Sequence, residues 1–175
     1  SPNGEKIMIP LIIITLSLIL DGILSNIFPY TVNNLSLFTP LLTLISIYLI
    51  YPFYKKKENK YILTIFLTGI IYDLLYTSLI FYNAIIFTII GIISKYIYKH
   101  YEINYLNIII QIILIVTIYE LLNALIIIIF NLVPMSIPKL FYKITHSLLL
   151  NIIYSELLLL IINILPSKYK KVNIN

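Results

Sequence analysis

Long apolar runs, separated by short polar or proline-containing segments, make up most of this 175-residue chain. Each run is close to the roughly 20 residues that a helix needs to cross a bilayer, and none shows the period-two alternation of a transmembrane β-barrel. The pattern therefore predicts an all-α integral membrane protein, a six-transmembrane-helix bundle. The expected helices cover approximately residues 8–28, 37–54, 61–81, 83–99, 104–132 and 140–165.

Prolines indicate where these helices begin and end. Pro10 is expected in the first turn of the first helix, where its missing N–H costs little. Pro29, Pro52 and Pro166 are expected to follow helix ends. This division gives three parts: residues 1–7 as an expression remnant or a short cytoplasmic N-terminus, 8–166 as the membrane domain, and 167–175 as a basic cytoplasmic tail.

Composition supports the membrane assignment and narrows the function. Hydrophobic residues form 61% of the chain, charged residues 11%, and the mean hydropathy is +1.01, whereas soluble domains carry roughly 25% charged residues. Six spans would leave only short loops, without room for a separate catalytic domain. The chain has no cysteine, which excludes disulfides, thiolate metal sites and cysteine nucleophiles.

The net charge of +5 comes from lysine and predicts the orientation. If six helices alternate, ten lysines fall on one side of the membrane and two on the other. By the positive-inside rule, the lysine-rich side and both termini are expected in the cytoplasm. The first group is Lys6, Lys55, Lys56, Lys57, Lys60, Lys95, Lys99, Lys168, Lys170 and Lys171, and the second is Lys139 and Lys143.

Four acidic residues lie well inside the apolar runs: Asp21, Asp73, Glu120 and Glu156. Each costs about 2.5–3.5 kcal/mol at the centre of a membrane helix, and no lysine is expected deep enough to pair with them. Interhelical hydrogen bonding is the first interpretation. A polar pocket or partner-docking surface, and a proton or ion relay, remain as alternatives.

Helical spacing predicts which polar residues share a face with these acids. Thr117, Glu120 and Asn123 fall on one face of the fifth helix. A period-four stripe on the sixth helix, with Glu156 beside it, should face protein and not lipid. That stripe is Ser147, Asn151 and Ser155.

Small residues predict a closely packed hairpin of the third and fourth helices. Gly69 precedes Asp73 by one turn, and small side chains let helix backbones approach closely. The matching stripe on the fourth helix is Ala84, Thr88, Gly91 and Lys95. No phosphate-binding glycine loop, nucleophile elbow or metal-ligand cluster is visible, so no enzyme and no cofactor are predicted.

The segments Phe66-Leu-Thr-Gly69-Ile-Ile-Tyr-Asp73-Leu-Leu and Asn83-Ala-Ile-Ile-Phe-Thr-Ile-Ile-Gly91-Ile-Ile resemble the rod shape-determining protein MreD family. Pro40, in Thr39-Pro40-Leu-Leu, and Asn151 also match that family. Thr77 and Phe81 depart from it, because glycines are common at those positions, so the turn between the third and fourth helices is expected to differ.

The resemblance implies a non-enzymatic scaffold of the bacterial cell-elongation machinery in the inner membrane. Such a protein binds MreC and is linked to RodA, a class B penicillin-binding protein and MreB. It also implies a fold like the S components of energy-coupling-factor vitamin transporters, which is the main alternative function. The residues Ile12-Ile13-Ile14-Thr15-Leu16-Ser17-Leu18 lack the Ala-x-x-x-Ala-like docking surface of S components, and the outer loops are short. Another small scaffold or lipid-handling protein is the remaining possibility.

Overall fold

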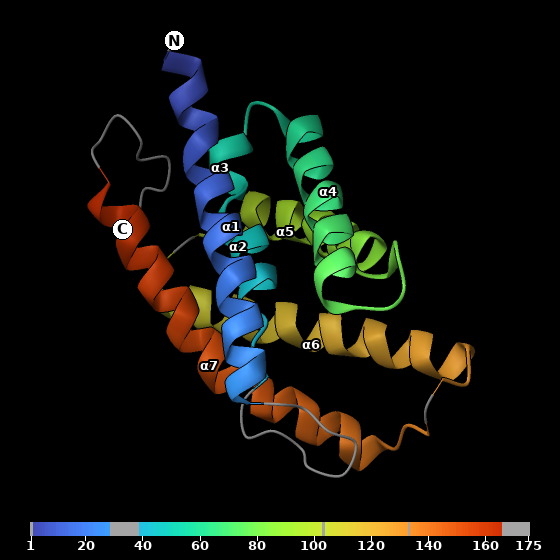
Figure 1. Ribbon diagram of the computed structural model, residues 1–175. Coiled ribbons are helices and arrows are strands. Elements are labelled where there is room, and N and C mark those ends of the chain that lie inside the picture. The colour runs from blue at the N-terminus through green and yellow to red at the C-terminus, as the bar shows by residue number, and fades with distance from the viewer. Residues whose placement is uncertain (1, 29–38, 103, 133, 166–175) are drawn as a thin grey trace.

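The computed structural model describes residues 2–28, 39–102, 104–132 and 134–165, and their regular structure is entirely helical. This confirms the all-α prediction. Figure 1 shows α6 running across the direction of α1 and α4, with α7 passing diagonally beside α1. Pro29, Pro166 and the basic tail 167–175 lie outside the described residues. The helices are α1 (Pro2–Ile27), α2 (Leu42–Leu49), α3 (Tyr51–Tyr54), α4 (Glu58–Tyr76), α5 (Tyr82–His100), α6 (Tyr105–Ile129) and α7 (Ile137–Ile164).

Three of the described helices are long and apolar enough to cross a membrane: α1 from Met8 to Ile27, α6 and α7. Helices α4 and α5 have 19 residues each. At 1.5 Å per residue each is about 28 Å long, close to the thickness of a bilayer core. Charged side chains lower their hydropathy, since α4 begins with Glu58 and α5 carries Lys95 and Lys99 in its last turns.

Two expectations about prolines are wrong. The second apolar run, 37–54, is not one helix, because α2 ends at Leu49 and Pro52 lies in the first turn of a separate helix, α3. Proline has no N–H to donate, so the backbone hydrogen-bond ladder is interrupted there. Pro10 lies in the interior of α1, because the helix begins at Pro2 and tolerates the loss of one backbone bond.

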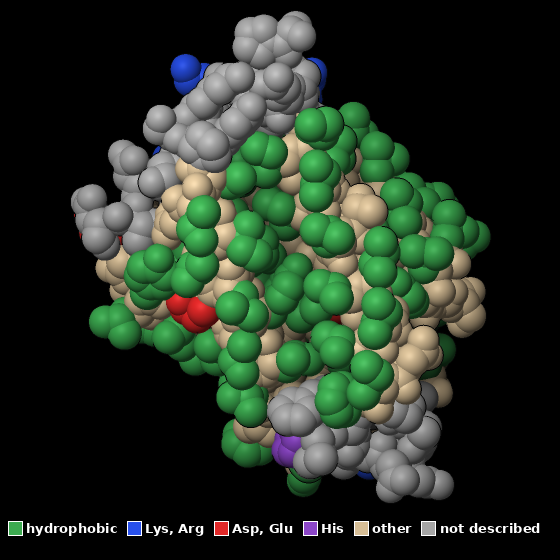
Figure 2. All heavy atoms as spheres, turned by 60° about the vertical axis from the view of Figure 1, so that its left-hand side comes forward, with side chains coloured by type: hydrophobic (Ala, Val, Ile, Leu, Met, Phe, Trp, Pro, Cys, Tyr) green, Lys and Arg blue, Asp and Glu red, His purple; other side chains and the backbone are tan. Residues whose placement is uncertain are grey.

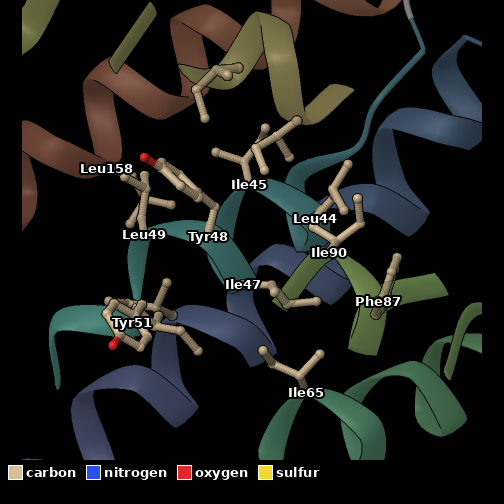
Figure 3. Packing of buried hydrophobic residues seen from close by; sticks show 14 of the residues in the cluster. Leu44, Ile45, Ile47, Tyr48, Leu49, Tyr51, Ile65, Phe87, Ile90 and Leu158 are labelled. Carbon is tan, nitrogen blue, oxygen red and sulfur yellow. The ribbon is translucent and has the colours of Figure 1, made fainter. Parts of the chain in front are cut away.

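Helix α2 is the centre of the core. Every residue of α2 and α3 is buried, and α1, α5 and α7 contact α2. A helix that is apolar all round must be enclosed by other elements. Figure 3 shows Leu44, Ile45 and Tyr48 projecting from α2 in different directions among side chains of the surrounding helices.

Helices α4 and α5 form the predicted closely packed hairpin. A Cβ atom added at Gly69 would lie 2.7 Å from the backbone nitrogen of Ala84, so only glycine permits this approach. Further along the pair, Gly91 faces Ile65, and Lys95 reaches Glu58. The small-residue stripe of α5 therefore faces α4 along most of its length.

The turn between α4 and α5 contains Phe81 with φ of 71°. A residue with a Cβ atom costs roughly 1–2 kcal/mol in this left-handed conformation, which glycine adopts freely. The ring of Phe81 stacks on that of Phe66, with centroids 6.3 Å apart. This contact supports a phenylalanine at a position where the resemblance leads one to expect glycine.

The outer surface of the bundle is apolar. Figure 2 shows hydrophobic side chains covering most of one face, with an acidic side chain among them. A soluble protein rarely exposes such an area, whereas lipid-facing helices require it. Exposed large side chains occur on α1, α4, α5, α6 and α7, including Leu16, Leu63, Ile85, Leu114 and Leu157.

Candidate functional site

Asp21 of α1 caps the beginning of α2. Its Oδ1 accepts a hydrogen bond from the backbone N–H of Leu42 at 2.8 Å, and its Oδ2 accepts from the N–H and the hydroxyl of Thr43 at 2.8 and 2.6 Å. The N-cap residue of α2, Leu41, has no side chain that could do this. The first N–H groups of a helix lack intrahelical partners, so a carboxylate from another helix supplies them.

Asn151 of α7 completes the same helix beginning. Its Oδ1 accepts from the N–H of Leu41 at 2.9 Å, and its Nδ2 donates to the carbonyl of Thr39 at 2.9 Å. Ser147, Asn151 and Ser155 are all fully buried, which confirms that this stripe faces protein. The segment around Pro40 is thus held between α1 and α7.

Asp73 of α4 caps the beginning of α5 in the same way. Its carboxylate accepts from the backbone N–H of Asn83 at 2.9 Å, from the Asn83 side-chain amide at 2.9 Å, and from the N–H of Ala84 at 3.2 Å. The Thr77 hydroxyl adds a fourth donor at 3.2 Å. Both aspartates therefore neutralise their charge with helix N-termini, and they need no lysine.

Two further hydrogen bonds connect the beginning of α5 to α6. The Tyr119 hydroxyl donates to Oδ1 of Asn83 at 3.0 Å, and the Tyr82 hydroxyl donates to Oδ1 of Asn123 at 2.8 Å. Glu120, which lies between the two α6 residues, is 1% exposed. These contacts extend the polar network from α4 to α6.

Glu120 pairs with a lysine, which corrects the expectation that no lysine reaches the buried acids. Lys143 Nζ lies 3.0 Å from Glu120 Oε2. Lys143 is in the second turn of α7, and its long apolar stem carries the ammonium group inward. The other carboxylate oxygen, Oε1, is buried and has no hydrogen-bond partner in the described part of the chain.

These helix ends surround a cavity of about 430 Å³, here called the outer cavity. Of the residues proposed from the sequence, Pro40, Asn83, Glu120 and Asn123 line it. Asp21 and Asp73 are not among the lining residues and instead accept hydrogen bonds from backbone N–H groups. The other candidates do not line it either: Gly69 and Gly91 are in the α4–α5 contact, Asn151 binds the beginning of α2, and Glu156 is on α7.

Among the cavity residues that sequence reasoning missed are Tyr82, Tyr119 and Lys143. Because the chain contains 16 tyrosines, there was no reason in the sequence to select Tyr82 and Tyr119, whose hydroxyls bind Asn123 and Asn83. Their positions did give an indication, because Tyr82 directly precedes Asn83 and Tyr119 directly precedes Glu120, and both Asn83 and Glu120 were candidate site residues. Lys143 was assigned to a membrane surface, although lysine side chains are long enough to point inward.

Glu156 has a different environment. Its side chain is partly buried on α7, and Oε1 is buried without a hydrogen-bond partner among the described residues. It is not among the residues that line the outer cavity. The four acids of the sequence therefore divide into two helix caps, one ion-paired cavity residue and one side chain without an assigned contact.

The opposite end of the bundle, here called the inner end, contains a cluster of tyrosines and a surface ion-pair group. Tyr48 donates from its hydroxyl to Oε1 of Gln111, and Tyr61 donates to the carbonyl of Ile47 at 3.0 Å. Outside the apolar part of α4, Glu58 pairs with Lys95 and with Lys99, the latter at 3.0 Å. Hydrogen bonds from Lys95 and Lys99 lower the pKa of Glu58 to about 2.

The site geometry favours structural and binding roles. The two aspartates are saturated with donors, and no group of three His, Asp or Glu side chains in the described ranges could hold a metal ion. The fold and site define an all-helical membrane protein whose buried carboxylates fix helix ends.

The chain belongs to the rod shape-determining protein MreD family, since the family model matches residues 5–169. This confirms the resemblance drawn from the Gly69–Asp73 and Asn83–Gly91 segments. The protein is therefore a membrane protein with a role in rod shape determination, in a family that is structural and not known for enzymatic activity. No curated protein and no solved structure matches the chain, so the likeness to S components stays a prediction.

Proposed function

We propose that the protein is a non-enzymatic scaffold of the bacterial cell-elongation machinery, in which it binds MreC. Through that complex it is linked to RodA, a class B penicillin-binding protein and MreB. The observation that carries the proposal is the match of nearly the whole chain to the MreD family. The use of Asp21 and Asp73 as helix caps agrees with it, because a scaffold needs buried polar groups that hold one rigid arrangement.

The scaffold crosses the inner membrane six times, with both termini in the cytoplasm. The outer cavity supports this topology, because helix ends that should share one side line it together. They are the ends of α1 and α4, the beginnings of α2 and α5, the second half of α6 and the first turns of α7. The second crossing consists of α2 and α3, which are enclosed by protein. The lysines at 55–60, 95 and 99 lie at the inner end, opposite the outer cavity.

Cysteine labelling tests this topology, because the natural chain has no cysteine. Asn59 and Ser78 are both exposed and lie at opposite ends of α4. In intact cells, Ser78→Cys should react with a membrane-impermeant maleimide and Asn59→Cys should react only after lysis. The reverse pattern would contradict the proposed orientation.

The apolar outer face is the proposed docking surface for the transmembrane helix of MreC. A photo-crosslinking amino acid placed at Leu16, Leu63, Leu114 or Leu157 tests four helices, because each side chain is about half exposed. At least one position should crosslink to co-expressed MreC, while the same group at the fully buried Ile45 should not. Absence of crosslinks together with reproducible separation of the two folded proteins in detergent would refute MreC binding.

A further inference from the structure

Glu120 has unused acceptor capacity where it lines the outer cavity. Its side chain is 1% exposed, yet its Oε1 accepts no hydrogen bond from the described residues. Lys143 approaches Oε2 from the α7 side at 3.0 Å. Because an ionised carboxylate has about four acceptor positions, Oε1 can accept a donor from a bound molecule.

Of the fifteen residues that line the outer cavity, Glu120 included, five are aromatic. A cation is attracted to the face of an aromatic ring, and the attraction strengthens in a site shielded from water. The hydroxyls of Tyr82 and Tyr119, two of the lining residues, already donate to Asn123 and Asn83, so toward a bound molecule their oxygens can only accept. The aromatic residues of the wall are Phe28, Tyr72, Tyr76, Tyr82 and Tyr119.

We propose that the outer cavity binds an organic ammonium group, with Glu120 as its counter-ion. A buried carboxylate in a cavity with a partly aromatic lining complements a positive group better than a neutral or anionic one. The volume of about 430 Å³ lies within the range of small-molecule sites. This binding goes beyond the scaffold function and does not depend on MreC.

Lys143 competes with a bound cation for Glu120, because its ammonium group is attached to α7 by a flexible side chain. Its side chain is 21% exposed and enters from the α7 side, so its ammonium group can leave Glu120 when another cation arrives. A group held by a short flexible tether acts at an effective concentration in the millimolar range. Removal of this ammonium group should therefore strengthen the binding of a free amine.

The test uses the full chain in detergent at pH 8, titrated with n-butylammonium chloride in a calorimeter, with 1-butanol as the neutral probe of similar size. Lys143→Met should bind butylammonium at least about tenfold more tightly than the parent, because it lacks a competing ammonium group at a millimolar effective concentration. Lys139→Met is the matched control, because Lys139 lies one turn earlier and does not line the cavity. It should bind like the parent.

Glu120→Gln, alone and combined with Lys143→Met, should abolish butylammonium binding, whereas Glu156→Gln should leave it unchanged. If Lys143→Met binds butylammonium no better than Lys139→Met, or binds butanol equally well, the proposal is wrong. That comparison also decides the matter if Glu120→Gln does not accumulate. Accumulation of Lys143→Met only when butylammonium is present would be rescue by the predicted ligand and would support the proposal.

The ammonium group can come from a free amine or from an ethanolamine lipid headgroup. Nanodiscs of pure phosphatidylglycerol and of phosphatidylglycerol with phosphatidylethanolamine distinguish these sources. Weaker apparent binding of butylammonium by Lys143→Met in the second type would identify the headgroup as a competing ligand. Equal binding in both would identify a free amine.

Discussion

The two aspartates beside the outer cavity and Glu58 at the inner end of the bundle have their charges balanced by different means. At the outer cavity, Asp21 and Asp73 are buried and accept hydrogen bonds from backbone N–H groups at the beginnings of α2 and α5. At the inner end, Glu58 is partly exposed and pairs with two lysines. Helix N-termini carry partial positive charge, so they can neutralise a carboxylate at a depth where a lysine would be costly.

This difference predicts how sensitive each end is to substitution. A buried donor left without an acceptor costs about 1–3 kcal/mol, and a cap serves several donors at once. An exposed ion pair contributes little and is screened by salt. Substitutions at the aspartates should therefore have much larger effects than substitutions in the lysine group.

The largest effect is expected for Asp73→Leu. It leaves the buried N–H groups of Asn83 and Ala84 without their acceptor, so we expect a loss of about 3 kcal/mol or more in the free energy of unfolding. The measurement is unfolding by SDS in mixed micelles, together with accumulation in cells and co-purification with MreC. Asp73→Asn keeps one acceptor oxygen, so it should retain most of the accumulation in cells and most of the co-purification with MreC.

Glu156→Leu is the control for the removal of an acid from the membrane, because no described residue hydrogen-bonds its buried oxygen. It should be neutral or stabilising. If Asp73→Asn fails as severely as Asp73→Leu, the charge itself is required and the cap is not the whole role of Asp73. If both variants behave like the parent, the cap contributes nothing measurable.

The next effect concerns the packing between the two ends. Gly69→Ala places a methyl group against the backbone of Ala84, which cannot move aside without separation of α4 and α5. Overpacking of this kind costs about 1–3 kcal/mol. Gly91→Ala is the matched comparison, because the only close contact of its added Cβ would be with the flexible Cδ1 end of Ile65, at 2.6 Å. Equal destabilisation by the two variants in SDS unfolding would contradict the close backbone approach at Gly69.

A smaller effect is expected at the tyrosine cluster of the inner end. Tyr48→Phe removes one hydroxyl and leaves Oε1 of Gln111 without its donor, which should cost about 1 kcal/mol. Tyr96→Phe, at a side chain that is 61% exposed, should change the free energy of unfolding far less. A destabilisation by Tyr48→Phe as large as that of Asp73→Leu would remove the contrast between the two ends.

The sequence predicted this arrangement in part. Continuous apolar runs predicted helices, and the spacing of Gly69, Ala84 and Gly91 predicted the hairpin contact, because both signals are local and periodic. The capping role of Asp21 could not be predicted in this way, since two of its three donors, the N–H groups of Leu42 and Thr43, are backbone groups that carry no residue-specific signal. The pairing of Glu120 with Lys143 was also missed, because it depends on where a long side chain turns between α6 and α7.

The smallest effect is expected at Glu58, and it should depend on pH and salt. Hydrogen bonds from Lys95 and Lys99 lower the pKa of Glu58 from 4.5 to about 2. A lowered pKa stabilises the folded protein above the unfolded value, and this contribution disappears as pH falls from about 4.5 to about 2. Glu58→Gln should therefore lower the Tm slightly at pH 7 in low salt. The difference in Tm from the parent should vanish near pH 2. It should also shrink in 1 M NaCl, where the Debye length is about 3 Å. A difference in Tm that persists at pH 2 would show that Glu58 acts through packing and not through its charge.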